Sequence, residues 1–360
     1  PKAMHDPVVA RIKILANMKL DEKRKPLDGR FKVQVGETAT DLRISTLPTV
    51  NGEKVVIRLL QDEGSVHNFR DLGLRGLSLK RVEEAILKPT GMLLVTGPTS
   101  SGKTVTLAST LNKLNTVRIN IMTLEDPVEI RVPGVNQVQV NPQAGLTFAT
   151  GLRAFLRQDP NVIMVGEIRD GETAELATHA ALTGHLVLAT LHTNSAAGAL
   201  PRLLDMDVED YLLVSTINAV VAQRLVRRIC PHCKKEVDPP EEIKEEIRGI
   251  MHGVAEGKLL SQSKDKEIIE SLKKVKENNI KLYRGEGCDK CDKTGYAGRI
   301  GIFEVLSMSD DLSDMVLDHA STARLHDQAQ KEGMLSLKQD GVLRVLEGTT
   351  TLEEVMRVAK

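Results

Sequence analysis

The sequence predicts an α/β protein whose main domain is a largely parallel sheet covered by helices on both faces. Short apolar runs alternate with helical stretches between residues 71 and 226, a pattern typical of parallel strands that are buried on both faces. The length of 360 residues and the apolar content of 41% are sufficient for two or three domains, each with a core of its own. The strand candidates are residues 92–96, 119–124, 135–140, 162–165 and 186–191.

Before this core we expect a small α/β domain over residues 1–60. The alternation in 32–35 and the β-branched run of 55–60 predict strands. Asp28-Gly29 and Asn51-Gly52 are strong turn sequences and are interpreted as turns.

The rest of the chain divides by composition. The polar segment QDEGSVHNFR is interpreted as a linker, and the stretch dense in Lys and Glu as an amphipathic helical insertion. Short helical runs over 312–318, 322–332 and 352–359 predict a helical C-terminal domain. The resulting segments are the linker at 61–70, the core at 71–226, a tetracysteine subdomain at 227–298 with the insertion at 234–283, and the C-terminal domain at 299–360.

Charge and hydropathy exclude some classes of protein. Lys plus Arg and Asp plus Glu number 49 each, so the net charge does not favour nucleic acid or anionic lipid. The sequence has no apolar run long enough to span a membrane and no signal peptide, so we expect a cytosolic protein. Because it begins abruptly with Pro1, we also expect that upstream targeting or docking modules are missing.

The segment Gly97–Thr104 reads GPTSSGKT and matches the phosphate-binding loop G-x-x-x-x-G-K-[ST]. It follows an apolar strand candidate and precedes a helical run, a context that argues against a chance Gly-rich turn. Backbone N–H groups and a helix N-terminus would face the phosphates of ATP, Lys103 would contact the β- and γ-phosphates, and Thr104 would bind Mg²⁺. The expected nucleotide-binding residues are Gly97, Pro98, Thr99, Ser100, Ser101, Gly102, Lys103, Thr104 and Val105.

Carboxylates follow two of the strand candidates. Glu125, Asp126 and Glu129 come after 119–124, and Glu167 comes after 162–165. Since ligands of open parallel sheets bind beyond the carboxyl ends of the strands, Glu129 and Glu167 are candidates for polarising water and binding Mg²⁺. The pattern does not choose between them, and a solvated turn closed by proline is the alternative for the first group.

Two histidines bracket the strand candidate 186–191. His185 and His192 lie about 23 Å apart if the strand is straight, so they cannot contact the same phosphate. His192, at the carboxyl end, is the candidate sensor of the γ-phosphate. For His185 we expect a structural or subunit-contact role. The alternative for both is an ordinary hydrogen-bonded histidine.

All four cysteines lie in two C-x-x-C pairs, Cys230 with Cys233 and Cys288 with Cys291. Four thiolates are a complete ligand set for structural Zn²⁺, with no position left open for catalysis. The separation of the pairs exceeds that of a compact zinc ribbon, which the helical insertion explains. The alternative is a dithiol redox pair.

Taken together, the motifs resemble the type II/type IV secretion ATPase superfamily. The resemblance rests on GPTSSGKT, TLEDPVE, VIMVGEIRD, TGHLVLATLHTN and the paired C-x-x-C with GYAGRIGIFEV. It implies a RecA-like core, a PAS-like preceding domain and a hexameric ring with ATP bound between the two domains. It also implies a cytoplasmic protein peripheral to the inner membrane, attached through partners: a membrane platform protein and a cytoplasmic adaptor. The resemblance further implies that the N-terminal domain is truncated, since the first strands of that family's preceding domain are missing here.

Within this superfamily, VPGVNQVQVNPQAGLTFATGLRAFLRQDPNVIMVGEIRD looks closest to the pilus-assembly (extension) ATPases, followed by the type II secretion ATPases. Retraction motors generally lack the tetracysteine element. The resemblance implies that Glu129 is the general base and that Glu167 takes the Walker B role at Mg²⁺. It further implies that Arg43 and Arg58 reach the nucleotide, although as isolated residues they would be surface charges.

Two other functions were weighed. A DNA-translocating ATPase predicts a basic stripe or pore loop, against which the balanced charge and the 2% aromatic content argue, so no direct nucleic-acid contact is expected. An inactive nucleotide-binding scaffold is disfavoured because Lys103, Thr104, Glu129 and Glu167 are all present.

Overall fold

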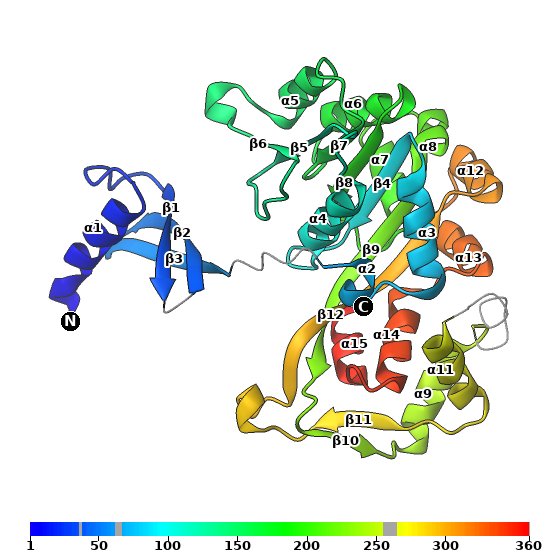
Figure 1. The fold of residues 1–360 in the computed structure, drawn as a ribbon. Helices are drawn as coiled ribbons and strands as arrows, with labels where there is room; N and C mark the ends of the chain where they lie inside the picture. The colour runs from blue at the N-terminus through cyan, green and yellow to red at the C-terminus, as the bar shows by residue number, and fades with distance from the viewer. Residues whose placement is uncertain (36–37, 62–66, 255–264, 360) are drawn as a thin grey trace. The chain divides into compact units, whose positions relative to one another are not determined.

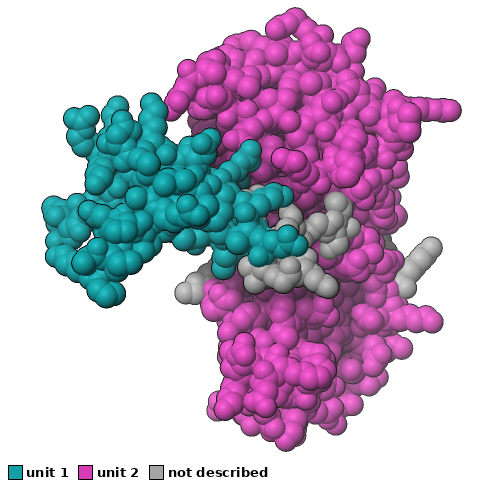
Figure 2. Space-filling model, turned by 60° about the vertical axis from the view of Figure 1, so that its left-hand side comes forward, with its two compact units in different colours: residues 1–65 teal, residues 66–360 magenta. Residues whose placement is uncertain are grey.

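The computed structural model describes residues 1–35, 38–61, 67–254 and 265–359. These residues form two compact units, Pro1–Ser65 and Val66–Lys360, which are coloured separately in Figure 2. Half of the predicted linker at 61–70, residues 62–66, lies outside the described residues.

In the N-terminal unit one helix covers a three-stranded antiparallel sheet with the order β1-β2-β3. Phe31, Leu42 and Ile44 are among the side chains that form its small core. Lys13 and Glu53 form a buried ion pair, with 2.5 Å between Nζ and Oε1. The elements are the 3₁₀ turn η1 (Lys2–Met4), α1 (His5–Leu15), β1 (Leu27–Val35), β2 (Thr38–Thr49) and β3 (Gly52–Gln61).

The predictions for this unit were partly wrong. Asn51-Gly52 does form the β2–β3 turn, but Asp28-Gly29 lies inside β1, where its residues pair with Ser45 and Ile44. The long strand β2 was not predicted at all. Its polar residues alternate with Leu42 and Ile44 because only one face of the sheet is covered.

The C-terminal unit is built on a seven-stranded sheet with the order β12-β9-β4-β8-β7-β5-β6 (Figure 1). All neighbouring pairs are parallel except β9–β12. The predicted α/β class is therefore confirmed, and each predicted core strand is present. The strands are β4 (Gly91–Thr96), β5 (Ile121–Glu125), β6 (Asn136–Gln139), β7 (Val162–Val165), β8 (Leu186–Leu191), β9 (Ile217–Ile229) and β12 (Tyr296–Ser307).

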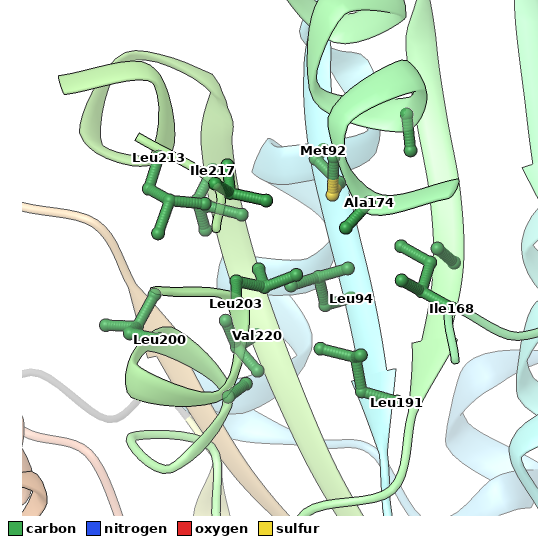
Figure 3. Packing of buried hydrophobic residues seen from close by; sticks show 14 of the residues in the cluster. Met92, Leu94, Ile168, Ala174, Leu191, Leu200, Leu203, Leu213, Ile217 and Val220 are labelled. Atoms are coloured by element: carbon green, nitrogen blue, oxygen red, sulfur yellow. The ribbon is translucent and has the colours of Figure 1, made fainter. Parts of the chain in front are cut away.

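Helices cover both faces of this sheet because alternate residues of its buried strands point to opposite sides. Leu93 and Val95 of β4 pack on one face with α2 (Phe69–Leu72), α3 (Gly76–Leu87) and α4 (Lys103–Leu114). Met92 and Leu94 pack on the other face, where Figure 3 shows them among side chains such as Ala174 and Leu203. The helices of that face are α5 (Phe148–Phe155), α6 (Gly171–Leu182), α7 (Ala199–Leu204) and α8 (Asp210–Thr216); the 3₁₀ turn η2 (Pro142–Ala144) precedes α5.

The tetracysteine segment continues directly from the sheet. The strands β9 and β12 cross the boundaries predicted at 226/227 and 298/299, with a register shift in their pairing between Tyr296 and Arg299, and Figure 1 shows them as a long antiparallel pair. The inserted helices share a second core with β9, β12 and the last two helices of the chain. The inserted elements are β10 (Lys234–Val237), α9 (Glu241–Met251), α11 (Lys266–Lys276), β11 (Leu282–Gly285) and the 3₁₀ turn η3 (Asp289–Cys291).

The C-terminal helices each begin after a Ser or Thr whose hydroxyl accepts a backbone N–H of the first turn. The second-last helix was not predicted; its polar residues Gln339, Asp340 and Arg344 are buried together with its apolar residues, so the usual division into an apolar and an exposed polar face is missing. These helices are α12 (Asp310–Leu317), α13 (Thr322–Lys331), α14 (Leu337–Leu346) and α15 (Leu352–Val358). Among the described residues, no helix combines the length and apolarity needed to cross a bilayer.

Truncating a core side chain of β4 should destabilise the C-terminal unit. Leu94 is 0% exposed, so Leu94→Ala should lower the free energy of unfolding by about 3 kcal/mol through lost burial and a residual cavity. The matched control is Leu87→Ala, because Leu87 is 75% exposed and should cost less than about 0.5 kcal/mol. Urea denaturation followed by circular dichroism measures both, and equal losses would contradict this packing.

Candidate nucleotide and metal sites

The phosphate loop joins the carboxyl end of β4 to the first residue of α4. Gly102 is the N-cap of α4 and has φ of +91°, which favours glycine. A Cβ atom on Gly97 would lie 2.6 Å from the Gln223 carbonyl oxygen, so only glycine fits at that position. Pro98, Thr99 and Ser100 are exposed between these glycines. The predicted loop therefore sits at the start of a helix, where N–H groups lack intrahelical partners.

Lys103 lies within this loop. Its Nζ donates to the carbonyl oxygens of Gly97 at 2.7 Å and Pro98 at 3.2 Å. Partial burial lowers the pKa of Lys103, while the negative charge of Glu167 acts in the opposite direction. The ammonium thus lies where the phosphates would bind, and the neighbouring hydroxyl of Thr104 is exposed.

Strand β9, the neighbour of β4, supports the phosphate loop. Thr96 pairs with Ala222, so the next residues of each strand lie side by side. Gln223 accepts a hydrogen bond from Thr106 Oγ1 of α4 at 2.7 Å. The sequence analysis did not identify Gln223 and Arg224 as site residues. A signal was present, because they are adjacent polar residues that directly follow the apolar run 219–222 of the strand.

Glu167 follows β7 and is the acidic centre of the site. Its side chain is 14% exposed, with Arg169 Nη2 2.5 Å from Oε1 and His192 Nε2 3.5 Å from Oε2. The structure therefore brings together Lys103, Glu167 and His192 from the ends of β4, β7 and β8. Arg169 was missed, although it follows the same strand end.

The acidic segment after β5 divides into buried and exposed groups. Glu125 is 4% exposed and accepts hydrogen bonds from Thr123 at 2.7 Å and Gln137 at 2.9 Å. Burial raises the pKa of Glu125, and the charge of Glu129 adds to the effect. Asp126 and Glu129 are exposed. Because Glu125 is buried and Glu129 is exposed, water reaches Glu129 more readily, which makes it the better candidate to accept a proton from water.

The two histidines occupy opposite ends of β8. His192 is exposed at the carboxyl end beside Glu167. At the other end, Nδ1 of His185 lies 2.8 Å from the Ala180 carbonyl oxygen, the hydrogen-bonded arrangement of a structural histidine.

The four cysteines form one cluster, although the two pairs are far apart in sequence. All four Sγ atoms lie within 4.8 Å of one another, and three of the separations are 3.7, 3.8 and 3.9 Å. A tetrahedral zinc ion with Zn–S distances of about 2.3 Å requires S···S separations of about 3.8 Å. Backbone N–H groups of Cys288 and Gly295 donate to Cys291 Sγ and lower its pKa to about 6. The donor set therefore fits zinc.

In the N-terminal unit, Arg43 and Arg58 are direct cross-strand partners in β2 and β3. They lie on the same face of that sheet, opposite to the face that carries Leu42 and Ile44. Arg58 is exposed and Arg43 is half-buried.

Comparison with known proteins decides the family. A sequence profile described as "Type II/IV secretion system protein" matches residues 1–357. The chain belongs to this family. The superfamily suggested by the motifs is thereby confirmed.

Several curated relatives align over nearly the whole chain. "Type IV pilus assembly ATPase PilB" proteins of Thermus thermophilus and Pseudomonas aeruginosa are each 46% identical, over 99% and 98% of this chain. "Type II secretion system protein E" of Pseudomonas aeruginosa is 45% identical over 98%. The chain spans 38%, 58% and 65% of the length of these three relatives, respectively.

Solved structures support the fold. The pilus retraction motor PilT with bound ADP has a TM-score of 0.62 at 25% identity, covering 92% of this chain and 77% of that one. The ATPase DotB of Yersinia pseudotuberculosis has a TM-score of 0.66 at 21% identity, covering 98% and 81%. The expected RecA-like fold is thus shared with the solved structures of PilT and DotB.

Proposed function

We propose that this chain is an ATP-hydrolysing motor subunit that powers assembly of a pilin fibre. The observation that carries the proposal is the convergence of Lys103, Glu167 and His192 beside the phosphate loop. The 46% identity to two pilus-assembly ATPases supports the choice of cargo. A type II secretion motor acting on pseudopilins is the second candidate, supported by a relative of nearly equal identity, 45%.

Each residue of the site has a role in this proposal. Lys103 holds the β- and γ-phosphates, and the backbone of the loop that runs to Val105 donates to their oxygens. Thr104 and Glu167 would hold Mg²⁺, which supplies charge neutralisation at the phosphates when bound. Glu129 accepts the proton of the attacking water, and His192 senses the γ-phosphate. Glu167 orients His192 through the 3.5 Å contact.

The assembly is also part of the proposal. Motors of this kind act as homo-hexamers, and the family assignment supports that state here. We infer a cytoplasmic protein held at the inner membrane by a platform protein and a cytoplasmic adaptor. Zn²⁺ bound by Cys230, Cys233, Cys288 and Cys291 would fix the far end of the β9–β12 pair.

The central test is ATP hydrolysis by the purified chain. Lys103→Ala should lower kcat by at least about 100-fold, because the cation on the phosphates is lost. Glu129→Gln should keep ATP binding and lower kcat by about 10²- to 10⁴-fold, because an amide cannot accept the proton. Wild-type turnover by Lys103→Ala would overturn the proposal. Normal hydrolysis by Glu129→Gln would reassign the base to Glu125 or Glu167.

Metal analysis tests the cysteine cluster. We expect about one zinc per chain, since four thiolates complete one tetrahedral site. Cys233→Ser with Cys288→Ser should release the metal, and hydrogen exchange should then rise in β10 and β11 before the central sheet. Absence of zinc together with four thiols that react freely in the native protein would contradict the metal assignment.

The arginines of the N-terminal unit provide a further test. We propose that Arg43 and Arg58 stabilise the charge that develops on the γ-phosphate, because a guanidinium is always charged and binds two oxygens at once. Arg58→Ala should lower kcat by about 10³-fold with a smaller effect on ATP affinity, and Arg43→Ala should behave similarly. Lys54→Ala is the control, as Lys54 is an exposed cation on the same face of β3. Near-normal rates in folded arginine variants would identify them as surface charges.

A further inference from the structure

A buried carboxylate outside the nucleotide-contacting residues holds the segment that follows β8. Glu304 of β12 is 2% exposed, and its Oε1 accepts the backbone N–H of Ala196 at 2.7 Å. Its Oε2 lies 3.5 Å from Nε2 of His326, which belongs to α13. Burying a carboxylate is costly unless its oxygens have partners, so both contacts stabilise the charge.

The strand register explains how one segment reaches this carboxylate. Leu191 pairs with Thr96, Thr96 with Ala222, and Ala222 with Glu304, so these residues form one row across β8, β4, β9 and β12. After Leu191 the chain passes over the ends of β4, β9 and β12. Each of these strands holds the passing segment by one side-chain contact, which we call an anchor. The anchors are Thr96 Oγ1 with Thr193 Oγ1 at 2.7 Å, Arg224 Nη2 with Asn194 O at 2.9 Å, and Glu304 Oε1 with Ala196 N at 2.7 Å.

This anchored segment, residues 192–196, begins with His192, which contacts Glu167 of the nucleotide site. Its other end is held by Glu304 and, through Glu304, by α13 of the C-terminal helices. A shift of His192 when the γ-phosphate is lost must therefore be absorbed by the anchors or transmitted to them.

The charge balance around Glu304 depends on the protonation state of His326. Glu304 raises the pKa of His326, Asp327 of its own helix adds to the effect, and partial burial opposes it. Arg224 is the other cation that interacts with Glu304. As the pH rises through the raised pKa, His326 loses its charge, and Glu304 keeps its interactions with Arg224 and the Ala196 N–H group. The contribution of the pair is thus complete below the ordinary histidine pKa and is lost as the pH rises through the raised pKa of His326.

We propose that Glu304 is a positioning residue that, with His326, couples the segment carrying His192 to the C-terminal helix α13. The proposal rests on the proposed ATPase function, since it assigns the route by which the state of the γ-phosphate reaches these helices. Glu304 touches no nucleotide atom in this scheme and acts through the Ala196 N–H group.

The test compares kcat, KM and pH profiles of the full chain for Glu304→Gln, His326→Gln and His326→Arg. Glu304→Gln should lower kcat about tenfold and change KM for ATP less than about twofold, because the phosphate loop is untouched. His326→Gln should lower kcat at about pH 6.5 and abolish the alkaline fall of the wild type. His326→Arg should retain wild-type kcat and lose the alkaline fall, because its cation does not titrate.

The matched control is His319→Gln. His319 of α12 lies 3.7 Å from Asp210, is 70% exposed and has no contact with residues 192–196 in the described structure, so its loss should leave kcat and the pH profile unchanged. Cooperative melting of each variant excludes misfolding.

The outcomes separate the two proposals. A wild type that hydrolyses ATP, with a kcat insensitive to Glu304→Gln and an alkaline fall that persists in His326→Arg, would overturn the coupling alone. A chain without Lys103-dependent hydrolysis would overturn the ATPase function and the coupling with it. A KM increase with unchanged kcat in Glu304→Gln would assign Glu304 to substrate binding and also contradict the proposal.

Discussion

The parallel pairing of β4 with β9 is the constraint on which the nucleotide site depends. Its register places Gln223 and Arg224 directly beyond the end of β4, where the phosphate loop begins. Shifting β9 by one residue would turn its polar side chains to the opposite face and remove the contacts to Thr106 and Asn194. The shape of the loop is thus set by a neighbouring strand as well as by its own glycines.

Burial of charged side chains fixes the backbone of this site precisely and also lowers the stability of the protein. Arg224 of β9, the neighbour of β4, is 8% exposed, and Glu304 of β12, the next strand, is 2% exposed. An apolar pair would pack there without desolvating charge, so the site keeps these groups at the expense of stability. Each donates to or accepts from backbone atoms of residues 192–196. Such contacts fix a main-chain segment in a way that apolar packing, which is not directional, does not.

Local signals in the sequence predicted the parts of the structure that depend on short-range pattern. The phosphate loop, the strand ends with Glu167 and His192, and the cysteine pairs were all identified from residues adjacent in the chain. Gln223, Arg224 and Glu304 were missed because their role arises from strand order, which brings together residues 96, 194 and 304. Helix α14 was missed for a related reason, since its polar residues Gln339, Asp340 and Arg344 are buried by tertiary packing instead of forming an exposed face.

The continuity of β9 and β12 has a mechanical consequence. Both strands pass from the nucleotide site to the cysteine cluster, where Cys230 follows the last residue of β9 and Cys291 precedes β12 by a few residues. A β ladder resists sliding because every backbone hydrogen bond along it would have to break together. In the proposed coupling, a movement of His192 would meet the β9–β12 ladder on one side and the contact of Glu304 with His326 of α13 on the other. Helix α13 also packs through Leu325 and Ala329 in the core of the central sheet, so the polar contact adds a directional link to an element that is already joined to the sheet by apolar packing.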